Sequence, residues 1–362
     1  MPAGVKAPLN LRTDAEVATD TLASMSPSLS RAVGIGLAVV ADQLLGDPRR
    51  HHPVAWFGSW ASRVEKPLYA DDRSNGAAYV AAAVAPVAVL GIVLERATRR
   101  HATAHAAATA LTTWAVLGAR SLAREGELMA DRLEDSDLDG ARSRLGNLCG
   151  RDPSSLDGPE LARAAVESMA ENTADAAVAS LFWGAVAGIP GMVVHRCLNT
   201  LDAMVGHRND RYRRFGTAAA RLDDAADWLP ARITGAMACL LAPLVGGRAG
   251  DAWRIMHRDA RDHPSPNGGW CEAAWAGALG VQLGGRNVYF SRVEERGLLG
   301  DGPRPTAREL RRASRLVTAV TVASASAIVL CCTPACASVN AWRSRRSSAC
   351  TGTSARKDRG RR

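Results

Sequence analysis

The chain has 362 residues, of which 47% are hydrophobic and 22% are charged, and its net charge is +9. The cations are dispersed arginines without an aromatic-rich basic patch, so we expect no nucleic-acid partner. No P-loop, H-E-x-x-H or G-x-S-x-G motif occurs, which excludes the enzyme classes built on those motifs.

The first third of the chain alternates polar segments with apolar runs. Residues 1–30 are rich in Ser, Thr, Ala and Pro, and we expect a flexible extension there. An apolar helix is expected at 33–46. Residues 77–94 form 18 uncharged positions, enough to cross a hydrocarbon core. A second, shorter apolar run at 105–119 predicts that the two runs form a hairpin of membrane helices.

The rest of the chain continues this alternation. We expect a water-facing helical layer at 120–172, then an apolar run at 174–195 that "GIPG" interrupts. Residues 233–247 are apolar but short for a span, and a last apolar run covers 316–332. The basic tail, 333–362, is expected to be disordered.

These runs predict an all-α, polytopic integral membrane protein with large polar helical loops, whose main unit covers 31–332. The alternative is a soluble helical protein with alanine-rich core helices, because alanine is only weakly apolar on insertion scales.

Charged residues repeat every four positions just before the third apolar run. Arg163, Glu167, Glu171 and Asp175 would share one helix face, with Asn172 beside it. The simple interpretation is a solvated face with an Arg163–Glu167 ion pair. Next to an apolar run charge is costly, which favours a functional site, and Mg²⁺ is the natural counter-ion for carboxylates.

A second polar cluster covers 198–232. Arginines beside acids and amides form a plausible clamp for carboxylate or phosphate, and the alternative is a basic loop that contacts lipid headgroups. "DDAAD" at 223–227 also matches the form by which polyprenyl-diphosphate enzymes hold Mg²⁺. The candidate residues are Asn199, Asp202, Arg208, Asn209, Arg211, Tyr212, Arg214, Arg221, Asp223 and Asp224.

A third polar stretch lies at 257–289. Asp259, His263, Ser265 and Asn267 flank two prolines, which stiffen the backbone and display the polar groups. The alternative is an ordinary Pro/Gly loop.

Five stretches in this order resemble the CobD/CbiB family, the adenosylcobinamide-phosphate synthases of cobalamin biosynthesis. They are "ADQLLGDPRRHHPVAWFG" (41–58), "AVESMAENTAD" (165–175), "NTLDAMVGHRNDRYRRFG" (199–216), "ARLDD" (220–224) and "RDARDHPSPNGGW" (258–270). The chain departs from the family at both ends, where the first 30 residues look additional and the last family helix gives way to a basic tail.

The resemblance implies a multi-pass membrane enzyme that joins adenosylcobyric acid to (R)-1-amino-2-propanol or its O-phosphate through an amide bond. It implies ATP as the energy source, with Mg²⁺ and an activated carboxylate. We expect a site on the cytoplasmic side of the cell membrane, with the lipid bilayer and possible corrin-pathway membrane enzymes as partners.

We assign roles from side-chain chemistry rather than from the resemblance. Carboxylates would hold metal ions, arginines would hold phosphate or propionate, and His263 would take a proton from the incoming ammonium. The metal-side carboxylates are Glu167, Glu171, Asp175, Asp223 and Asp224, of which Glu167 and Glu171 are also placed in the catalytic centre. The anion clamp is Arg208, Arg211 and Arg214. Asp42, Asp47 and His52 would close the site, and Asn172, Asn199, Asn209, Asn267 and Asn287 would bind corrin amides.

Two other function classes stay open. A membrane prenyltransferase-like enzyme would use "DDAAD" together with a second acidic motif. A transporter or scaffold would carry charges along its membrane spans rather than in loops.

The membrane topology sets one further condition. If 174–195 and 233–247 both crossed the bilayer, the three polar stretches would not share one side. We therefore predict that at least one of these runs is re-entrant or is buried against protein.

Overall fold

The computed structural model describes residues 26–47, 52–207, 209–289 and 292–332. Most of the expected extension (1–30) and all of the tail (333–362) lie outside the described residues. The elements, in chain order, are α2 (Pro27–Leu45), α3 (Pro53–Leu68), α4 (Arg73–Thr98), α5 (Ala102–Val116), α6 (Ala119–Glu134), α7 (Leu138–Leu145), α8 (Gly158–Thr173), the π-helix η1 (Ala174–Val178), α9 (Ala179–Val205), α10 (Thr217–Leu241), the 3-10 helix η2 (Ala242–Val245), α11 (Ala249–Asp259), the 3-10 helix η3 (Ala260–Asp262), α12 (Gly268–Leu279), β1 (Leu283–Tyr289), β2 (Arg292–Leu299) and α13 (Ala307–Cys331).

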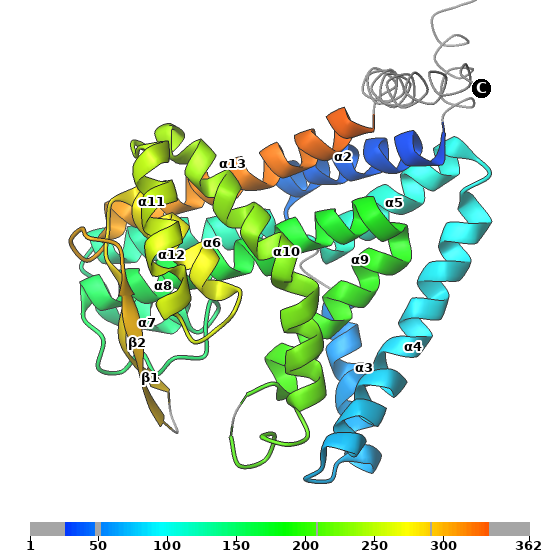
Figure 1. The fold of residues 1–362 in the computed structure, drawn as a ribbon, viewed down its shortest axis with the longest axis horizontal. Helices are drawn as coiled ribbons and strands as arrows, with labels where there is room; N and C mark the ends of the chain where they lie inside the picture. Colours follow the sequence, from blue (N-terminus) through cyan, green and yellow to red (C-terminus); the bar gives the residue numbers. More distant parts are fainter. Residues whose placement is uncertain (1–25, 48–51, 208, 290–291, 333–362) are drawn as a thin grey trace, which may run out of the picture.

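The predicted all-α, polytopic architecture is confirmed. Among the described residues, β1 and β2 form an antiparallel hairpin and the other elements are helical. Figure 1 shows long helices on one side of the molecule and a compact layer around α8, α11, α12 and the hairpin on the other. The segments that are long and apolar enough to cross a membrane are Pro27–Leu45, Arg73–Thr98, Gly158–Val205, Thr217–Val245 and Ala307–Cys331.

Helix α5 pairs differently from the prediction. It follows α4 in the chain, but it packs closely along α2 (Figure 1), where a Cβ at Gly34 would come within 2.6 Å of the Ala106 carbonyl oxygen. At one end of this pair, Ser30 Oγ hydrogen-bonds His105 Nδ1 at 2.7 Å. The small residues of both helices permit this approach, so the expected pairing of 105–119 with 77–94 is replaced by a pairing with α2.

The apolar run that contains "GIPG" turns back on itself at Gly188. This glycine has φ 69° and ψ −156°, outside the range of ordinary L-residues. Glu95 of α4 accepts a hydrogen bond from the Ile189 backbone N–H at 3.1 Å, so its carboxylate caps the helical segment that begins there. Arg31 of α2 pairs with Glu95 at 2.8 Å and donates to the Ala185 carbonyl at 3.2 Å. The prediction that one run reverses is confirmed.

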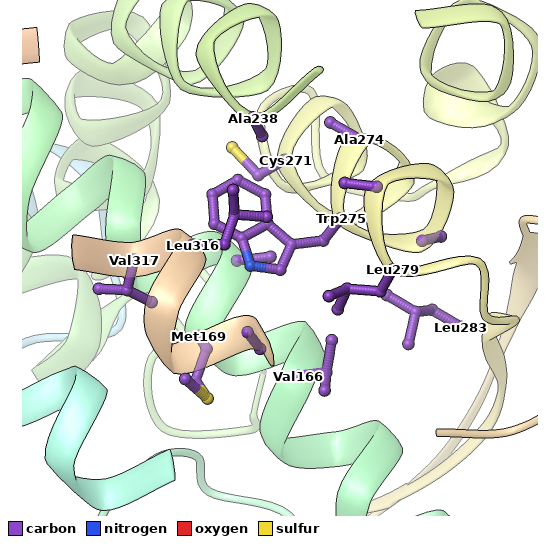
Figure 2. Close-up of a cluster of buried hydrophobic side chains, with 14 of the residues drawn as sticks. Val166, Met169, Ala238, Cys271, Ala274, Trp275, Leu279, Leu283, Leu316 and Val317 are labelled. Carbon is purple, nitrogen blue, oxygen red and sulfur yellow. The ribbon is translucent and has the colours of Figure 1, made fainter. Parts of the chain in front are cut away.

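The centre of the core lies where we expected water-facing helices and loops. Figure 2 shows the indole of Trp275 on α12 enclosed by side chains of α8, α10 and α13, among them Met169 and Leu316. All apolar residues of α8 and nearly all residues of α12 are buried. The prediction for 120–172 is therefore wrong at α8. The abundant alanines and glycines let neighbouring helices approach on several sides at once, and a helical pattern read from one face misses this.

We predict that Gly188→Ala destabilises the protein, because a Cβ there would be strained at positive φ and would lie 2.7 Å from Glu95 Oε2. The expected loss is about 1–3 kcal/mol, measured as a lower Tm in detergent. The control is Gly250→Ala on α11, where a Cβ would meet nothing within 4 Å. A Tm for Gly188→Ala equal to that of this control would contradict the assigned role.

Candidate functional site

A polar cavity of about 310 Å³ brings together the three polar stretches that the sequence singled out. Its walls come from α8 and η1, the end of α9, α10, the loop before α12, and β2. Glu171 and Asp202 both line it, although a straight helix would place residues 31 apart roughly 45 Å from each other. The reversal at Gly188 is therefore what assembles the cavity.

Carboxylates dominate the charge of this cavity. The lining acids are Glu171, Asp175, Asp202, Asp223, Asp224, Asp227 and Glu294. Facing them are the guanidinium of Arg296 and the imidazoles of His207 and His263. Such an excess of acid in a confined space needs cations to offset the mutual repulsion.

The densest part of the acidic group is suited to a divalent cation. Ligand atoms of His195, Asp223 and Asp227 lie within 4.8 Å of one another, and all three residues are buried. His195 Nε2 holds Asp227 Oδ1 at 2.8 Å, whereas Asp223 Oδ1 has no hydrogen-bond partner among the described residues. Carboxylate oxygen is the ligand Mg²⁺ prefers. The donor set therefore fits Mg²⁺ on Asp223 and Asp227, with Asp175 and Asp224 also lining the cavity.

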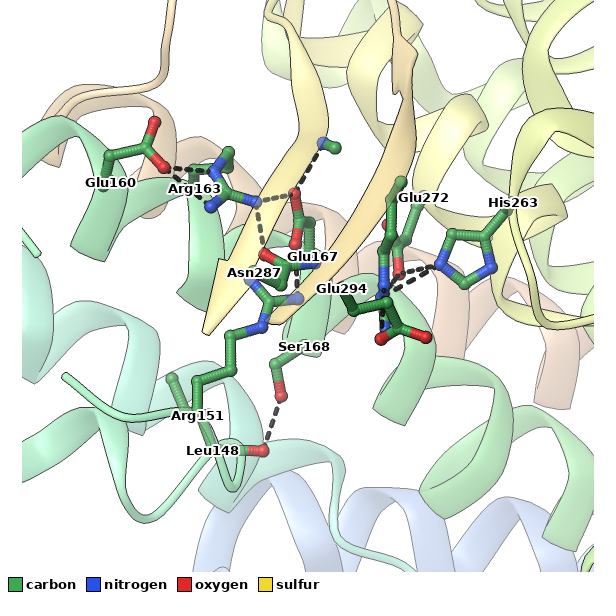
Figure 3. A network of polar contacts seen from close by, with 12 residues as sticks. Leu148, Arg151, Glu160, Arg163, Glu167, Ser168, His263, Glu272, Asn287 and Glu294 are labelled. Carbon is green, nitrogen blue, oxygen red and sulfur yellow. Dashed lines mark hydrogen bonds and ion pairs between the residues drawn. The ribbon is translucent and has the colours of Figure 1, made fainter. Parts of the chain in front are cut away.

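His263 points toward the buried acid Glu272, as Figure 3 shows, and the same ring nitrogen also contacts Arg296. Its Nδ1 accepts a hydrogen bond from the Ser265 N–H at 3.1 Å, so in the neutral ring the proton lies on Nε2. Nε2 is 3.3 Å from Glu272 Oε1 and 3.0 Å from Arg296 Nη1. Burial lowers the pKa of His263, but the Glu272 carboxylate more than offsets this, and the pKa lies above its ordinary value.

Glu167 belongs to a separate network of buried ion pairs and hydrogen bonds (Figure 3). Its carboxylate binds Arg163 Nη1 at 3.0 Å and Arg151 Nη2 at 2.5 Å, and it accepts the Gly284 N–H at 2.7 Å. Arg163 also holds Asn287 Oδ1 at 2.9 Å. The predicted Arg163–Glu167 pair exists, but it is buried rather than solvated. It joins α8 to the β-hairpin, and neither Glu167 nor Asn287 lines the cavity.

The predicted stripe divides into two pairs of residues with different surroundings. Glu171 and Asp175 line the cavity, whereas Arg163 and Glu167 face the hairpin. η1 (Ala174–Val178) breaks the regular four-residue repeat next to Asp175. Such π-bulges are frequent at functional sites.

The first motif lies beside the cavity without lining it. Asp42 is buried and accepts a hydrogen bond from the Arg120 N–H at 3.1 Å. His52 caps α3 through Val54 N at 3.2 Å. Arg196 links the first motif to the cavity electrostatically. Its charge interacts with Asp47 of the motif and with Asp175 and Asp223 of the cavity.

The predicted arginine clamp is not assembled by the described residues. Arg208 lies outside them. Arg211 instead pairs with Glu65 at 3.0 Å and stacks on Tyr69 at 4.2 Å. Tyr212 donates to the same glutamate at 2.9 Å. Of the remaining residues, Asn209, Arg214 and Arg221 are exposed and do not line the cavity.

The other predicted residues divide between cavity and scaffold. Ser265 and Asn267 line the cavity, and Asn267 Nδ2 donates to the Asp224 carbonyl at 2.8 Å. Asn199 hydrogen-bonds Asp223, which supports that acid. Asn172 donates to the Ser168 carbonyl at 2.8 Å, outside the lining. Asp259 binds Arg258 and the Gly300 N–H, which fixes α11 to the loop after β2.

The sequence analysis did not select His195, Arg196, Glu272, Glu294 or Arg296. His195 ends the apolar run 174–195, and Arg196 follows it directly. Glu272 is a single charge in a stretch interpreted as loop, whereas Glu294 and Arg296 stand in the charged stretch "RVEER" at 292–296. One signal was available, since an ionisable residue within a membrane-length segment is by default a functional candidate. The cavity acids Asp175, Asp202, Asp223 and Asp227 also lie on helices rather than in loops.

We predict that Glu167→Gln destabilises the fold by about 3–5 kcal/mol, because it leaves Arg151 buried without a countercharge and removes one of the two carboxylates that Arg163 binds. Unfolding in detergent by denaturant would measure this. Glu125→Gln is the matched control, since its pair with Arg144 is about one-quarter exposed and such pairs contribute about 0–1 kcal/mol. Equal losses in the two variants would argue against the network.

We predict a pH-dependent stabilisation by His263. Because its folded-state pKa is raised, its contribution is complete below the unfolded value of about 6.5 and is lost as pH rises through the folded-state value. The Tm difference between wild type and His263→Asn should therefore shrink between pH 5.5 and pH 9. His257→Asn, at an exposed position on α11, is the control. A difference that grows with pH would contradict the arrangement.

Comparison with known proteins identifies the chain's relatives. The family model described as CobD/Cbib protein matches residues 35–317, which include every residue of the cavity. The cobalamin biosynthesis protein CobD of Mycobacterium tuberculosis is 50% identical over 293 residues, 80% of this chain and 93% of the relative. Its namesake in Geobacter metallireducens is 44% identical over 273 residues, 74% and 86% of the two chains. The protein of the same name in Rhodobacter capsulatus is 42% identical over 285 residues, which are 78% of this chain and 89% of the relative. No solved structure matches. The chain belongs to the CobD/Cbib family.

Proposed function

We propose that this protein is an amide-forming ligase of cobalamin biosynthesis. It joins a propionate carboxylate of adenosylcobyric acid to the amine of (R)-1-amino-2-propanol or its O-phosphate, with ATP and Mg²⁺. The family and the names of its members support the pathway. The acidic cavity supports the chemistry.

The excess of carboxylates in the cavity is the observation that carries the proposal. An ammonium group is a cation, and a phosphate that carries Mg²⁺ presents the metal ion to the protein. An acidic cavity therefore attracts both groups. Mg²⁺ on Asp223 and Asp227, with Asp175 and Asp224 nearby, would neutralise phosphate charge when bound. Arg296 is the guanidinium within the lining that can meet an anionic oxygen.

The size of the cavity limits what enters it. At about 310 Å³ it lies at the low end of ligand pockets, which measure roughly 300–1,000 Å³. It accommodates an aminopropanol phosphate or the end of a propionate arm. We therefore place the corrin macrocycle outside the mouth, with only the reacting carboxyl group inside.

Glu171 is the best placed proton acceptor. It lines the cavity and makes no hydrogen bond or ion pair with another described residue. ATP would transfer its γ-phosphoryl group to a propionate oxygen and release ADP. The amine nitrogen would then attack the carboxyl carbon of this acyl phosphate, the bond from that carbon to the phosphate oxygen would break, and the proton lost by the nitrogen would pass to Glu171 as phosphate leaves. Both ring nitrogens of His263 are engaged, so we assign it to positioning Glu272 and Arg296 rather than to proton abstraction.

The bilayer is the expected environment of the long helices. Their length and composition suit membrane crossing. We propose the cell membrane as the location, with the cavity facing the cytoplasm, where ATP is available.

One observation favours a prenyltransferase-like alternative. Glu171 and Asp175 face Asp223, Asp224 and Asp227 across the same cavity, which supplies the second acidic group that such enzymes need. Incubation of the membranes with a prenyl diphosphate and Mg²⁺ distinguishes the two reactions, because the ligase should release no pyrophosphate from it.

We predict that membranes containing the protein convert adenosylcobyric acid, aminopropanol phosphate and ATP–Mg²⁺ into adenosylcobinamide phosphate, detected by mass spectrometry. Asp223→Asn and Glu171→Gln should lower kcat about 10²–10⁴-fold, as for loss of a metal ligand or a general base. Arg211→Gln is the control, because Arg211 lies outside the cavity, and it should retain activity. No product from folded wild-type protein would refute the ligase.

A further inference from the structure

A second cavity, of about 640 Å³, lies at the start of α13 and is unrelated to the acidic one. It is lined by Glu134, Leu244, Val245, Gly246, Leu279, Arg308, Arg311, Arg312 and Arg315. The arginines are spaced i, i+3, i+4 and i+7, so they share one face of the helix. Acids in or next to the cavity pair with two of these arginines, Arg311 with Asp131 and Glu134 and Arg312 with Glu309. The charges of Arg308 and Arg315 make the cavity cationic.

Two of these arginines hold the fold together. Arg311 binds Glu134 and Asp131 of α6 at 2.6 and 2.8 Å. Arg312 donates to the carbonyl oxygens of Val245 at 2.6 Å and Leu279 at 2.8 Å, which close the ends of η2 and α12. Their hydrogen-bonding capacity is thus largely used.

The other two arginines are available. Arg308 and Arg315 are exposed, and neither makes an ion pair or hydrogen bond with any residue that the structure describes. Arg308 lies in the first turn of α13, where the helix dipole is positive and disfavours cations, and Arg315 lies on the same face two turns later. A bound anion would relieve both the dipole and the mutual repulsion of the guanidinium groups.

The surroundings of the cavity are apolar on one side. Leu316 begins the apolar part of α13, and the whole helix, Ala307–Cys331, is long and apolar enough to cross a membrane. Leu244 lines the cavity and is 67% exposed, and Leu240, one turn earlier, is 65% exposed. Arginines at the end of a membrane helix lie at headgroup level, and exposed leucines beside them suit acyl chains.

We propose that this arginine cavity binds the phosphate group of an anionic phospholipid, with Arg308 and Arg315 as its main contacts and Leu240 and Leu244 against the acyl chains. A free phosphate would satisfy the same arginines, but it would leave the two exposed leucines without a function. The lipid therefore accounts for both the charged and the apolar side of the cavity.

The test measures lipid binding to the full chain in a non-ionic detergent. Native mass spectrometry would follow titration with dioctanoyl phosphatidylglycerol, with dioctanoyl phosphatidylcholine as the zwitterionic comparison and inorganic phosphate as competitor. Wild type should prefer phosphatidylglycerol. Arg308→Gln/Arg315→Gln should weaken that binding about thirty-fold, because each arginine at a membrane surface contributes about one factor of five.

Arg99→Gln/Arg100→Gln is the matched control, since it removes the same charge from exposed positions at the C-terminal end of α4. It should bind phosphatidylglycerol as wild type does. Equal binding by the cavity variant, equal binding of the two lipids, or displacement of phosphatidylglycerol by inorganic phosphate would each overturn the proposal. The last result would identify a site for free phosphate instead. The ligase assay does not enter this test, so the two proposals stand or fall separately.

Discussion

The reversal of the chain at Gly188 is the constraint on which the acidic cavity depends. Without it, α9 would carry Asp202 far from Glu171 and Asp175 along a single rod. The turn needs a residue that tolerates positive φ, a cap for the new helix and a countercharge for that cap. The residue with positive φ is Gly188 of α9, the cap is Glu95 of α4, and the countercharge is Arg31 of α2. The shape of the cavity therefore depends on the contacts around Gly188, none of which lies in the cavity wall.

Buried charge is used in two ways in this protein. Glu167 is surrounded by Arg151, Arg163 and a backbone N–H, so its charge is fully compensated and serves to join α8 to the β-hairpin. Most acids of the cavity make no direct ion pair with an arginine among the described residues, Glu294 with Arg296 being an exception, and Asp223 retains a buried oxygen without a hydrogen-bond partner there. An uncompensated acid is costly to bury, and this cost is offset when a cation binds. This contrast distinguishes scaffold from site more clearly than sequence position does.

The two cavities have opposite charge and different walls. The acidic one is enclosed by α8, η1, α9, α10, α12 and β2, whereas the arginine cavity lies where α13 meets η2 and α6. Separation of this kind lets the arginines contact an anionic surface while the acids attract cationic groups. The paired residues Arg311 and Arg312 hold the second cavity in place by fixing α13 to its neighbours.

The sequence by itself determined the helical class, the membrane-length segments, the family and the stretches that supply the cavity. Those properties depend on local composition and on motif order, which are present in the chain before it folds. It did not determine the partners of individual side chains. Glu167 and Glu171 are equivalent in a four-residue repeat, yet one meets two arginines and the other meets the cavity. Arg211 resembles a clamp residue until Glu65, 146 positions away, binds it. Glu272 is an isolated charge and Arg296 belongs to a charged stretch, and neither setting shows which residues the side chain meets. Only the tertiary structure decided these roles, because burial and pairing of a charge depend on residues that the fold, not the chain, brings near.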